Sequence, residues 1–125
     1  MRLLIADDNH EAAETLAELL RLLVPPPVEV MVAFDGQQAL AAASGSYPSV
    51  VIMDIEMPVM DGVSAAVEIR RVLGSRTPIL IAATGRSDIL NGLCAGGVFD
   101  HALLKPLKLD MFLALLLRSH AEAQA

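Results

Sequence analysis

The sequence is poor in the residues on which many binding and secreted proteins depend. It contains no tryptophan, one tyrosine, three phenylalanines and a single cysteine, Cys94. So few aromatic rings leave little surface for stacking on bases or sugars, and they require a core of aliphatic side chains. One cysteine excludes an internal disulfide and fits a reducing cytosol. Cys94 is interpreted as a small core residue.

The chain also lacks a long apolar segment and a concentration of basic charge. More than half of its 125 residues are apolar, but no apolar run approaches the roughly 20 residues of a membrane span. The N-terminus turns acidic at Asp7-Asp8, too early for a signal peptide. A net charge of −6, with Arg70-Arg71 as the only basic doublet, argues against nucleic-acid binding. We therefore expect a cytoplasmic protein with one domain at 1–120 and a C-terminal tail at 121–125.

Short β-type runs alternate with longer segments of helical period. The pattern predicts strands at 3–6, 28–33, 50–53, 78–82 and 102–104. It predicts a first helix from the N-cap Asn9 to the prolines at 25–27, and further helices at 36–43, 62–73, 88–95 and 107–119. Each helical crossover returns the chain in the same direction, so the fold class is α/β, a five-stranded parallel sheet flanked by five helices.

One of these helices is expected to be weaker than the others. Asn91-Gly92 lies inside the segment 88–95, and Gly96-Gly97 follows it. A glycine within a helix costs about 1 kcal/mol relative to alanine. We therefore expect this helix to be the least stable part of the domain.

Polar side chains stand where the predicted strands end. Asp7 and Asp8 follow the first strand, Asp54 the third, Thr84 the fourth and Lys105 the fifth. In an open parallel sheet, the carboxyl ends of the strands form the ligand-binding edge. Three neighbouring carboxylates repel one another unless a cation is present, and Mg²⁺ prefers such oxygen ligands. A metal beside a carboxylate, a hydroxyl and an ammonium group suits phosphoryl transfer.

The motifs at these positions resemble those of receiver domains of two-component response regulators. The stretch 53–62, Met-Asp-Ile-Glu-Met-Pro-Val-Met-Asp-Gly, is similar to the phosphoacceptor loop of that family. Asp7-Asp8, the Ala83-Thr84-Gly85 element and Lys105-Pro106 resemble its other signatures, in the expected order. The resemblance covers essentially the whole chain and implies a (βα)5, flavodoxin-like, doubly wound fold.

The resemblance also implies a role for each site residue. Asp54 would be the phosphorylated nucleophile, and Mg²⁺ would be held by Asp8 directly, by Asp7 through water, by Asp54 and by the backbone carbonyl of Glu56. Thr84 would bind the phosphoryl group in the active state, and Lys105 would pair with it. The Lys105-Pro106 bond would be cis.

The same resemblance implies the partners. The phosphodonor would be a histidine kinase or a histidine phosphotransfer protein. The domain would not be an enzyme in its own right, but would catalyse its own phosphorylation and dephosphorylation. Its output would be the face formed by the fourth helix, fifth strand and fifth helix, which could also form a weak homodimer.

Two features depart from the family pattern or are particular to this chain. An aromatic residue or histidine commonly stands three positions before the lysine, and here that position is Ala102. The usual coupling of the threonine to an aromatic switch is therefore not expected. Glu56 and Arg86 flank the predicted phosphoryl site, and their opposite charges suggest an ion pair across its opening.

Several alternative functions remain to be weighed. The chain could be a receiver from a hybrid histidine kinase in a phosphorelay, as Phe99-Asp100-His101 suggests. An aspartyl-nucleophile phosphatase of the haloacid-dehalogenase kind needs Asp-x-Asp after its first strand and a cap region, which this chain lacks room for. A flavodoxin-like cofactor binder needs a Ser/Thr/Gly-rich first loop, whereas Asp7-Asp8 would repel a phosphate. A pseudo-receiver that only binds partners is disfavoured because the full set of site residues is present.

Overall fold

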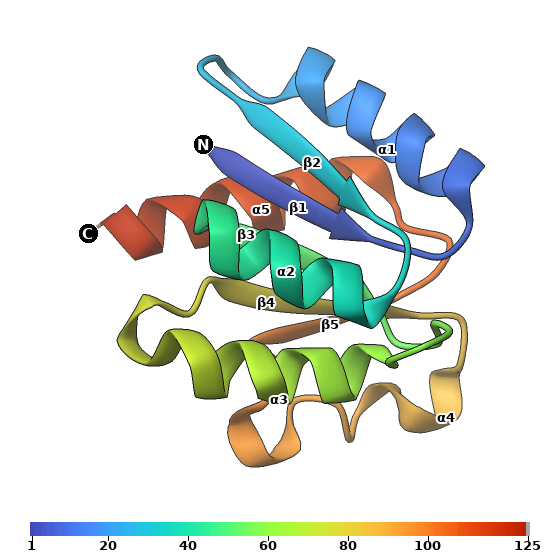
Figure 1. Cartoon of the computed structure of the whole chain (residues 1–125). Helices are drawn as coiled ribbons and strands as arrows, with labels where there is room; N and C mark the ends of the chain where they lie inside the picture. The colour runs from blue at the N-terminus through green and yellow to red at the C-terminus, as the bar shows by residue number, and fades with distance from the viewer. Residues whose placement is uncertain (125) are drawn as a thin grey trace.

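The predicted parallel sheet is confirmed in the computed structural model, which describes residues 1–124 (Figure 1). Five parallel strands lie in the order β2-β1-β3-β4-β5. The strands are β1 (Arg2–Ala6), β2 (Glu29–Ala33), β3 (Val50–Asp54), β4 (Ile79–Thr84) and β5 (His101–Leu104). The helices are α1 (His10–Leu23), α2 (Gly36–Ser46), α3 (Gly62–Leu73), α4 (Ser87–Leu90) and α5 (Leu109–Gln124), with short 3-10 turns at Gly74–Arg76 and Ala95–Gly97.

Helices cover both faces of the sheet and enclose two aliphatic cores. One core joins β1, β3 and β4 to α2 and α3, through residues such as Leu4, Met53 and Ile69. The other joins the opposite sides of the same strands to α1 and α5, through residues such as Leu20 and Phe112. Every residue of β3 is buried, as expected for a parallel strand covered on both faces.

Polar side chains fix the beginnings of three helices. Asn9, Asp35 and Asp61 each accept a hydrogen bond from the backbone N–H three residues further on, at 3.0, 2.7 and 2.8 Å. Such caps satisfy N–H groups that have no partner inside the helix. The predicted cap at Asn9 is thereby confirmed. Because the caps follow β1, β2 and β3, they also fix where the loops at the carboxyl edge end.

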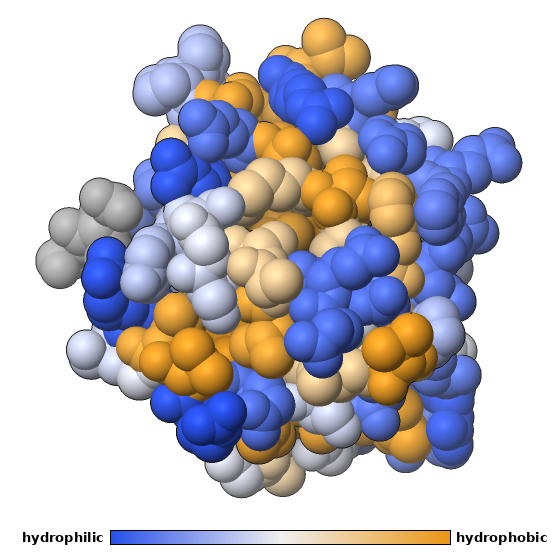
Figure 2. Space-filling view, in the orientation of Figure 1, coloured by the Kyte–Doolittle hydropathy of each residue, from blue (hydrophilic) through white to orange (hydrophobic). Residues whose placement is uncertain are grey.

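Small residues, more than large ones, face the core from the helices. Helical spacing brings Val63, Val67, Ile69 and Val72 near one face of α3, but of these only Ile69 is buried, and the three valines are exposed. Ala65 and Ala66 are buried as well, since α3 packs closely on its neighbours. Figure 2 shows the result, with apolar residues scattered among polar ones on the face that carries α2 and α3.

Several helix boundaries differ from the predicted ones. Helix α2 continues three residues past Ala43, and α5 starts two residues late, at Leu109, and continues beyond Ser119 through Gln124. The helix thus enters the predicted tail at 121–125, of which Ala125 lies outside the described residues. None of the described helices is long and apolar enough to cross a membrane.

The segment after β4 departs most from the prediction. Instead of a helix over 88–95, only the single turn of α4 forms, and no residue of that turn is buried. Gly96 and Gly97 adopt positive φ angles of 80° and 77°, which end any helical continuation. Cys94 is exposed here, so its predicted place in the core is wrong. Ile89 and Leu93 reach the core only as partly buried side chains, which gives little apolar contact to stabilise a longer helix on the sheet.

We expect residues 87–97 to be the least protected part of the folded domain in amide hydrogen exchange. Their helical hydrogen bonds are few and solvent-exposed, whereas α1 buries Ala13, Ala17 and Leu20. Exchange measured by mass spectrometry at pH 7 checks this. Protection in 87–97 equal to that of α1 would contradict it.

Candidate functional site

The carboxyl ends of the strands bring the predicted site residues to one edge. Asp7 and Asp8 directly follow β1, Asp54 ends β3, and Lys105 directly follows β5. The strand order changes direction at β1 and β3, so this edge is the switch point at which doubly wound sheets bind ligands. Thr84 ends β4 next to it.

Three carboxylates meet at the centre of the site. Asp7, Asp8 and Asp54 each offer an oxygen atom, and these atoms lie within 4.8 Å of one another. Their surroundings differ, since Asp8 is exposed, Asp7 is half-buried, and only 8% of Asp54 is exposed. A polar side chain at the end of a wholly buried strand has little access to water, which makes its charge sensitive to its neighbours.

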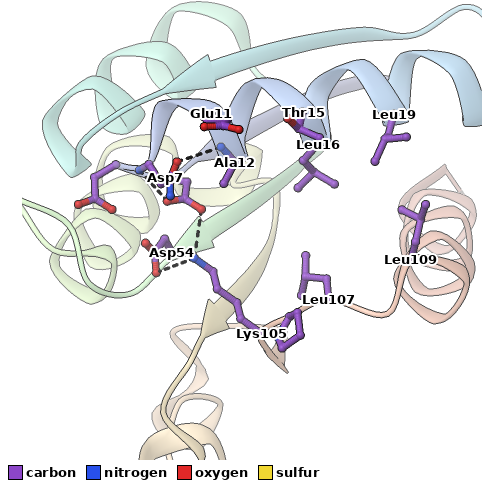
Figure 3. Close-up of a pocket in the computed structure, with 13 residues that line it drawn as sticks. Asp7, Glu11, Ala12, Thr15, Leu16, Leu19, Asp54, Lys105, Leu107 and Leu109 are labelled. Atoms are coloured by element: carbon purple, nitrogen blue, oxygen red, sulfur yellow. Dashed lines mark hydrogen bonds and ion pairs between the residues drawn. The ribbon is translucent and has the colours of Figure 1, made fainter.

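Lys105 supplies the positive charge among these carboxylates (Figure 3). Its Nζ lies 3.1 Å from Oδ2 of Asp7 and 3.3 Å from Oδ1 of Asp54. The backbone N–H of Asn9 donates to Oδ1 of Asp7 at 3.0 Å, which fixes that carboxylate from the other side. The lysine therefore bridges β1 and β3 from the loop after β5. The Lys105-Pro106 peptide bond is cis, as the family resemblance implied.

Burial and charge act against each other on Asp54 and Lys105. Burial raises the pKa of Asp54 most, and the charge of Asp7 raises it further, although Lys105 pulls it down. For Lys105, burial favours the neutral amine, but the hydrogen bond to Asp7 and the charges of Asp54 and Asp7 outweigh it and leave the pKa raised. One ammonium group thus compensates the carboxylates only in part.

The donor set fits a small divalent cation. Mg²⁺ takes oxygen ligands at about 2.0–2.1 Å in an octahedron, so its opposite ligands lie roughly 4.2 Å apart. Three carboxylate oxygens within 4.8 Å can meet that requirement if one of them binds through water. The donors are oxygens only, which suits Mg²⁺ better than zinc or copper.

Thr84 lies beside the site with its hydroxyl group bonded to its own loop. The residue is 1% exposed, and its Oγ1 accepts a hydrogen bond of 3.0 Å from the backbone N–H of Arg86. Accepting this bond leaves the hydroxyl hydrogen free to donate elsewhere. Ala102, at the position where the family commonly has an aromatic ring, pairs with Ala82 in the sheet and is half-buried.

The suggested ion pair between Glu56 and Arg86 does not form. The Arg86 guanidinium binds Asp88, with Nη2 2.8 Å from Oδ2 and Nε 3.3 Å from Oδ1. The pKa of Arg86 is raised mainly by this hydrogen bond and by the charge of Asp88, and least by Glu56. Asp88 is only two residues from Arg86, so their pairing costs little conformational entropy and forms in preference to a pair with Glu56. The ion pair suggested across the opening of the site is therefore wrong.

Sequence reasoning missed a groove that leads away from the carboxylates. It runs between α1 and the loop after β5, and it is lined by Glu11, Ala12, Thr15, Leu16 and Leu19 on one side and by Pro106, Leu107 and Leu109 on the other (Figure 3). Helical spacing groups Ala13, Leu16, Leu20 and Leu23 on α1. Of these, Ala13 and Leu20 are buried together with Ala17, whereas Leu16 is only partly buried. The surplus of leucines on α1 was the available signal.

The raised pKa of Asp54 predicts that Asp54→Asn stabilises the metal-free protein at pH 7. A folded-state pKa above the ordinary 3.8 means that the ionised carboxylate destabilises the fold, a loss that is complete above the raised pKa and vanishes as pH falls below 3.8. We expect a gain of about 2–6 °C in Tm, which corresponds to roughly 1 kcal/mol in a small domain.

Thermal unfolding in a metal chelator, at several pH values between 7 and 4, measures this gain. The advantage of Asp54→Asn should shrink as the pH falls. Glu11→Gln is the control, because Glu11 lines the same groove but lies outside the carboxylate cluster. An Asp54→Asn protein that melts at or below wild type at pH 7 would show that attraction to Lys105 outweighs burial.

Comparison with known proteins agrees with this geometry. The family profile of the response regulator receiver domain matches residues 3–117. The transcriptional regulatory protein PrrA of Mycobacterium tuberculosis is 35% identical over 115 residues, covering 90% of this chain and 47% of PrrA. A protein-glutamate methylesterase/protein-glutamine glutaminase of Aliivibrio fischeri is 35% identical over 101 residues, covering 78% of this chain and 26% of that protein. The chain thus spans about half the length, or less, of these curated relatives.

Solved structures share the fold and, in one case, more of the sequence. The receiver domain of sensor histidine kinase PA1611 from Pseudomonas aeruginosa, with a magnesium ion coordinated in its active site cleft, is 31% identical with a TM-score of 0.81, covering 96% of this chain and 97% of that one. A CheY-like receiver domain from Methanospirillum hungatei is 20% identical with a TM-score of 0.86, covering 98% and 95%. The chain belongs to the response regulator receiver domain family of two-component systems.

Proposed function

We propose that this domain accepts a phosphoryl group on Asp54 from a phosphohistidine donor, with Mg²⁺ bound at the carboxylates. The observation that carries the proposal is the position of Asp54, at the end of a fully buried strand, between Lys105 and the acidic pair. A solvent-exposed carboxylate would bind water, whereas this one is held and partly desolvated, as a nucleophile needs to be.

The residues have separate roles in the transfer. An Asp54 oxygen attacks phosphorus, and the bond from phosphorus to the donor's imidazole nitrogen breaks with its electron pair going to that nitrogen. The imidazole leaves neutral when its other ring nitrogen carries a proton before the transfer. Lys105 moves or shares its contact so that its ammonium group faces a phosphoryl oxygen, and the Thr84 hydroxyl donates to another. Asp7, Asp8, Asp54 and the carbonyl of Glu56 would hold Mg²⁺, which when bound neutralises charge on the phosphoryl oxygens.

The partners follow from this chemistry. The phosphodonor is a histidine kinase or a histidine phosphotransfer protein, and the domain supplies the catalytic groups for accepting and losing the phosphoryl group. Phosphorylation changes the face made by α4, β5 and α5, where Leu104 is 42% exposed and Met111 is 65% exposed. We propose this face as the output surface and as the site of a weak homodimer.

A receiver that works inside a hybrid histidine kinase is the second candidate. It is favoured by the 31% identity to the receiver domain of sensor histidine kinase PA1611, which covers nearly all of both chains. The chemistry at Asp54 is the same in both cases, and only the source of the phosphoryl group and its destination differ. A phosphotransfer profile against purified kinases and phosphotransfer proteins distinguishes them.

Phosphorylation of Asp54 is directly testable. Incubation with acetyl phosphate and Mg²⁺ is expected to add one phosphoryl group, seen as an acid-stable, base-labile adduct by intact-protein mass spectrometry. Asp54→Asn should abolish the adduct, because the nucleophile is lost. Asp35→Asn is the control, since Asp35 caps α2 away from the carboxylate cluster. Equal labelling of Asp54→Asn and wild type would refute the assignment.

Asp8 provides an independent test of the metal site. Asp8→Asn is expected to weaken Mg²⁺ binding about tenfold or more, because it removes a negative ligand from the cluster. Titration calorimetry measures the affinity, and the Mg²⁺-dependent rise in Tm gives a second reading of it. Glu11→Gln should bind Mg²⁺ as wild type does. An unchanged affinity in Asp8→Asn would exclude Asp8 as a ligand.

A further inference from the structure

The loop between β3 and α3 contains a strained turn. The N–H of Met60 donates to the carbonyl oxygen of Pro58 at 2.7 Å, closing a three-residue turn with Val59 at its centre. Val59 has a φ of +68°, an unfavourable region for a β-branched residue, and γ-turns of this sign are rare. Its side chain is 82% exposed, so packing around that side chain does not hold the turn. The strain must be held by the loop's other contacts.

Two backbone hydrogen bonds hold the loop at its two sides. The N–H of Gly62 donates to the carbonyl oxygen of Ile55 at 2.9 Å, which closes the loop on itself. The N–H of Gly36, the first residue of α2, donates to the carbonyl oxygen of Met60 at 3.0 Å. The second bond is the one that ties the strained turn to another element of the fold.

The contact at Gly36 leaves no room for a side chain. A Cβ atom on Gly36 would lie 2.1 Å from the carbonyl oxygen of Met60 and 2.7 Å from its carbonyl carbon. These are backbone atoms, so they cannot rotate away as the end of a side chain would. Any other residue at position 36 must therefore displace Met60 or the start of α2.

We propose that Gly36 is a positioning residue for the phosphoacceptor loop, which it holds in the strained geometry that presents Glu56 to the metal site. The inference rests on the proposed Mg²⁺ site and extends it to a residue that touches none of the ligands. Glu56 lies in the same loop, and its backbone N–H is 3.4 Å from Oδ1 of Asp54. Mg²⁺ tolerates little departure from octahedral geometry, so displacement of the loop should weaken Mg²⁺ binding.

The test compares two glycines of the same helix. Gly36→Ala should displace Met60, whereas Gly45→Ala is the matched control because a Cβ on Gly45 meets nothing within 4 Å. Titration calorimetry, at a temperature where all variants are folded, should show Mg²⁺ binding weakened about tenfold or more in Gly36→Ala, the size typical of lost outer-shell support. Gly45→Ala should stay within about twofold of wild type, as expected for a site that tolerates alanine.

A rescue variant separates positioning from a general loss of stability. Glycine adopts a positive φ without strain and also reaches other backbone angles, so Val59→Gly should let the turn readjust around the Cβ added in Gly36→Ala. The rest of the loop can then return to the metal site, which should restore much of the lost Mg²⁺ affinity. In metal-free protein, amide hydrogen exchange at 55–62 should rise in Gly36→Ala and fall again in the double variant. A purely structural role for Gly36 would lower Tm but leave the affinity of the folded protein unchanged.

Three outcomes overturn the proposal: wild-type Mg²⁺ affinity in folded Gly36→Ala, an equal loss in Gly45→Ala, or no rescue by Val59→Gly. Should Gly36→Ala not fold, a Mg²⁺ titration of the wild type followed by NMR decides. The amides of Gly36 and Met60 should then shift with the same Kd as that of Glu56, and a Gly36 amide that does not respond contradicts the coupling. Absence of Mg²⁺ binding in wild type refutes the proposed function instead. Amide hydrogen exchange at 55–62 in the metal-free protein then still tests whether Gly36 holds the loop.

Discussion

Two carboxylates that share one ammonium group, with a third carboxylate beside them, set the conditions for the rest of this structure at the end of a buried sheet. Lys105 reaches Asp7 and Asp54 at 3.1 and 3.3 Å, and both contacts lie at the edge where β1 and β3 stop. Burial makes such charges costly, so they persist only because the sheet around them is well packed. The two aliphatic layers of the core supply that stability, and the partly buried charges at the site lower it. Under the proposed function, the carboxylate cluster that would bind the metal is unfavourable for folding in its absence, so stability and metal binding oppose each other at Asp54.

One side of the site is well packed and hydrogen-bonded, and the other side has few buried contacts. On the well-packed side, β1 and β3 are buried, and the loop after β3 is held by Gly36 and Gly62. On the other side, the Thr84 hydroxyl is bonded to the backbone N–H of Arg86 in its own loop, and α4 is a single turn without a buried residue. Under the proposed function, a phosphoryl group on Asp54 would attract the hydroxyl of Thr84. The segment expected to move is the loop after β4 together with α4, because its rearrangement breaks the fewest buried contacts. Because Ala102 offers no aromatic ring to move, that response must travel through the backbone of the loop after β4.

The sequence was most informative where one physical effect dominates. The strands at 3–6 and 50–53 are continuous apolar runs, and their burial follows from hydrophobicity alone. The convergence of Asp7, Asp8, Asp54 and Lys105 follows from parallel topology, which needs only the order of the elements. Helical spacing groups Val63 and Val67 on α3 but does not show which residues are buried. Close packing of α3 on its neighbours leaves room for small side chains, so Ala65 and Ala66 are buried. The pair Glu56–Arg86 was wrong because charge sign alone does not exclude a nearer partner, here Asp88. The contact of Gly36 with Met60 joins residues far apart in the chain, so no local sequence pattern predicts it.

Charge also constrains the order of events in the proposed reaction. Asp7, Asp8 and Asp54, when ionised, outnumber the single ammonium group of Lys105, so the empty site is negative overall. A phosphoryl group carries further negative charge and would be repelled by that site at short range, where screening by salt is weak. A bound divalent cation would cancel that net negative charge, attract the donor's phosphoryl oxygens and lower the repulsion between the carboxylates. In the proposed reaction, metal binding should therefore precede productive docking of the donor, because electrostatic repulsion would oppose that encounter in the metal-free protein.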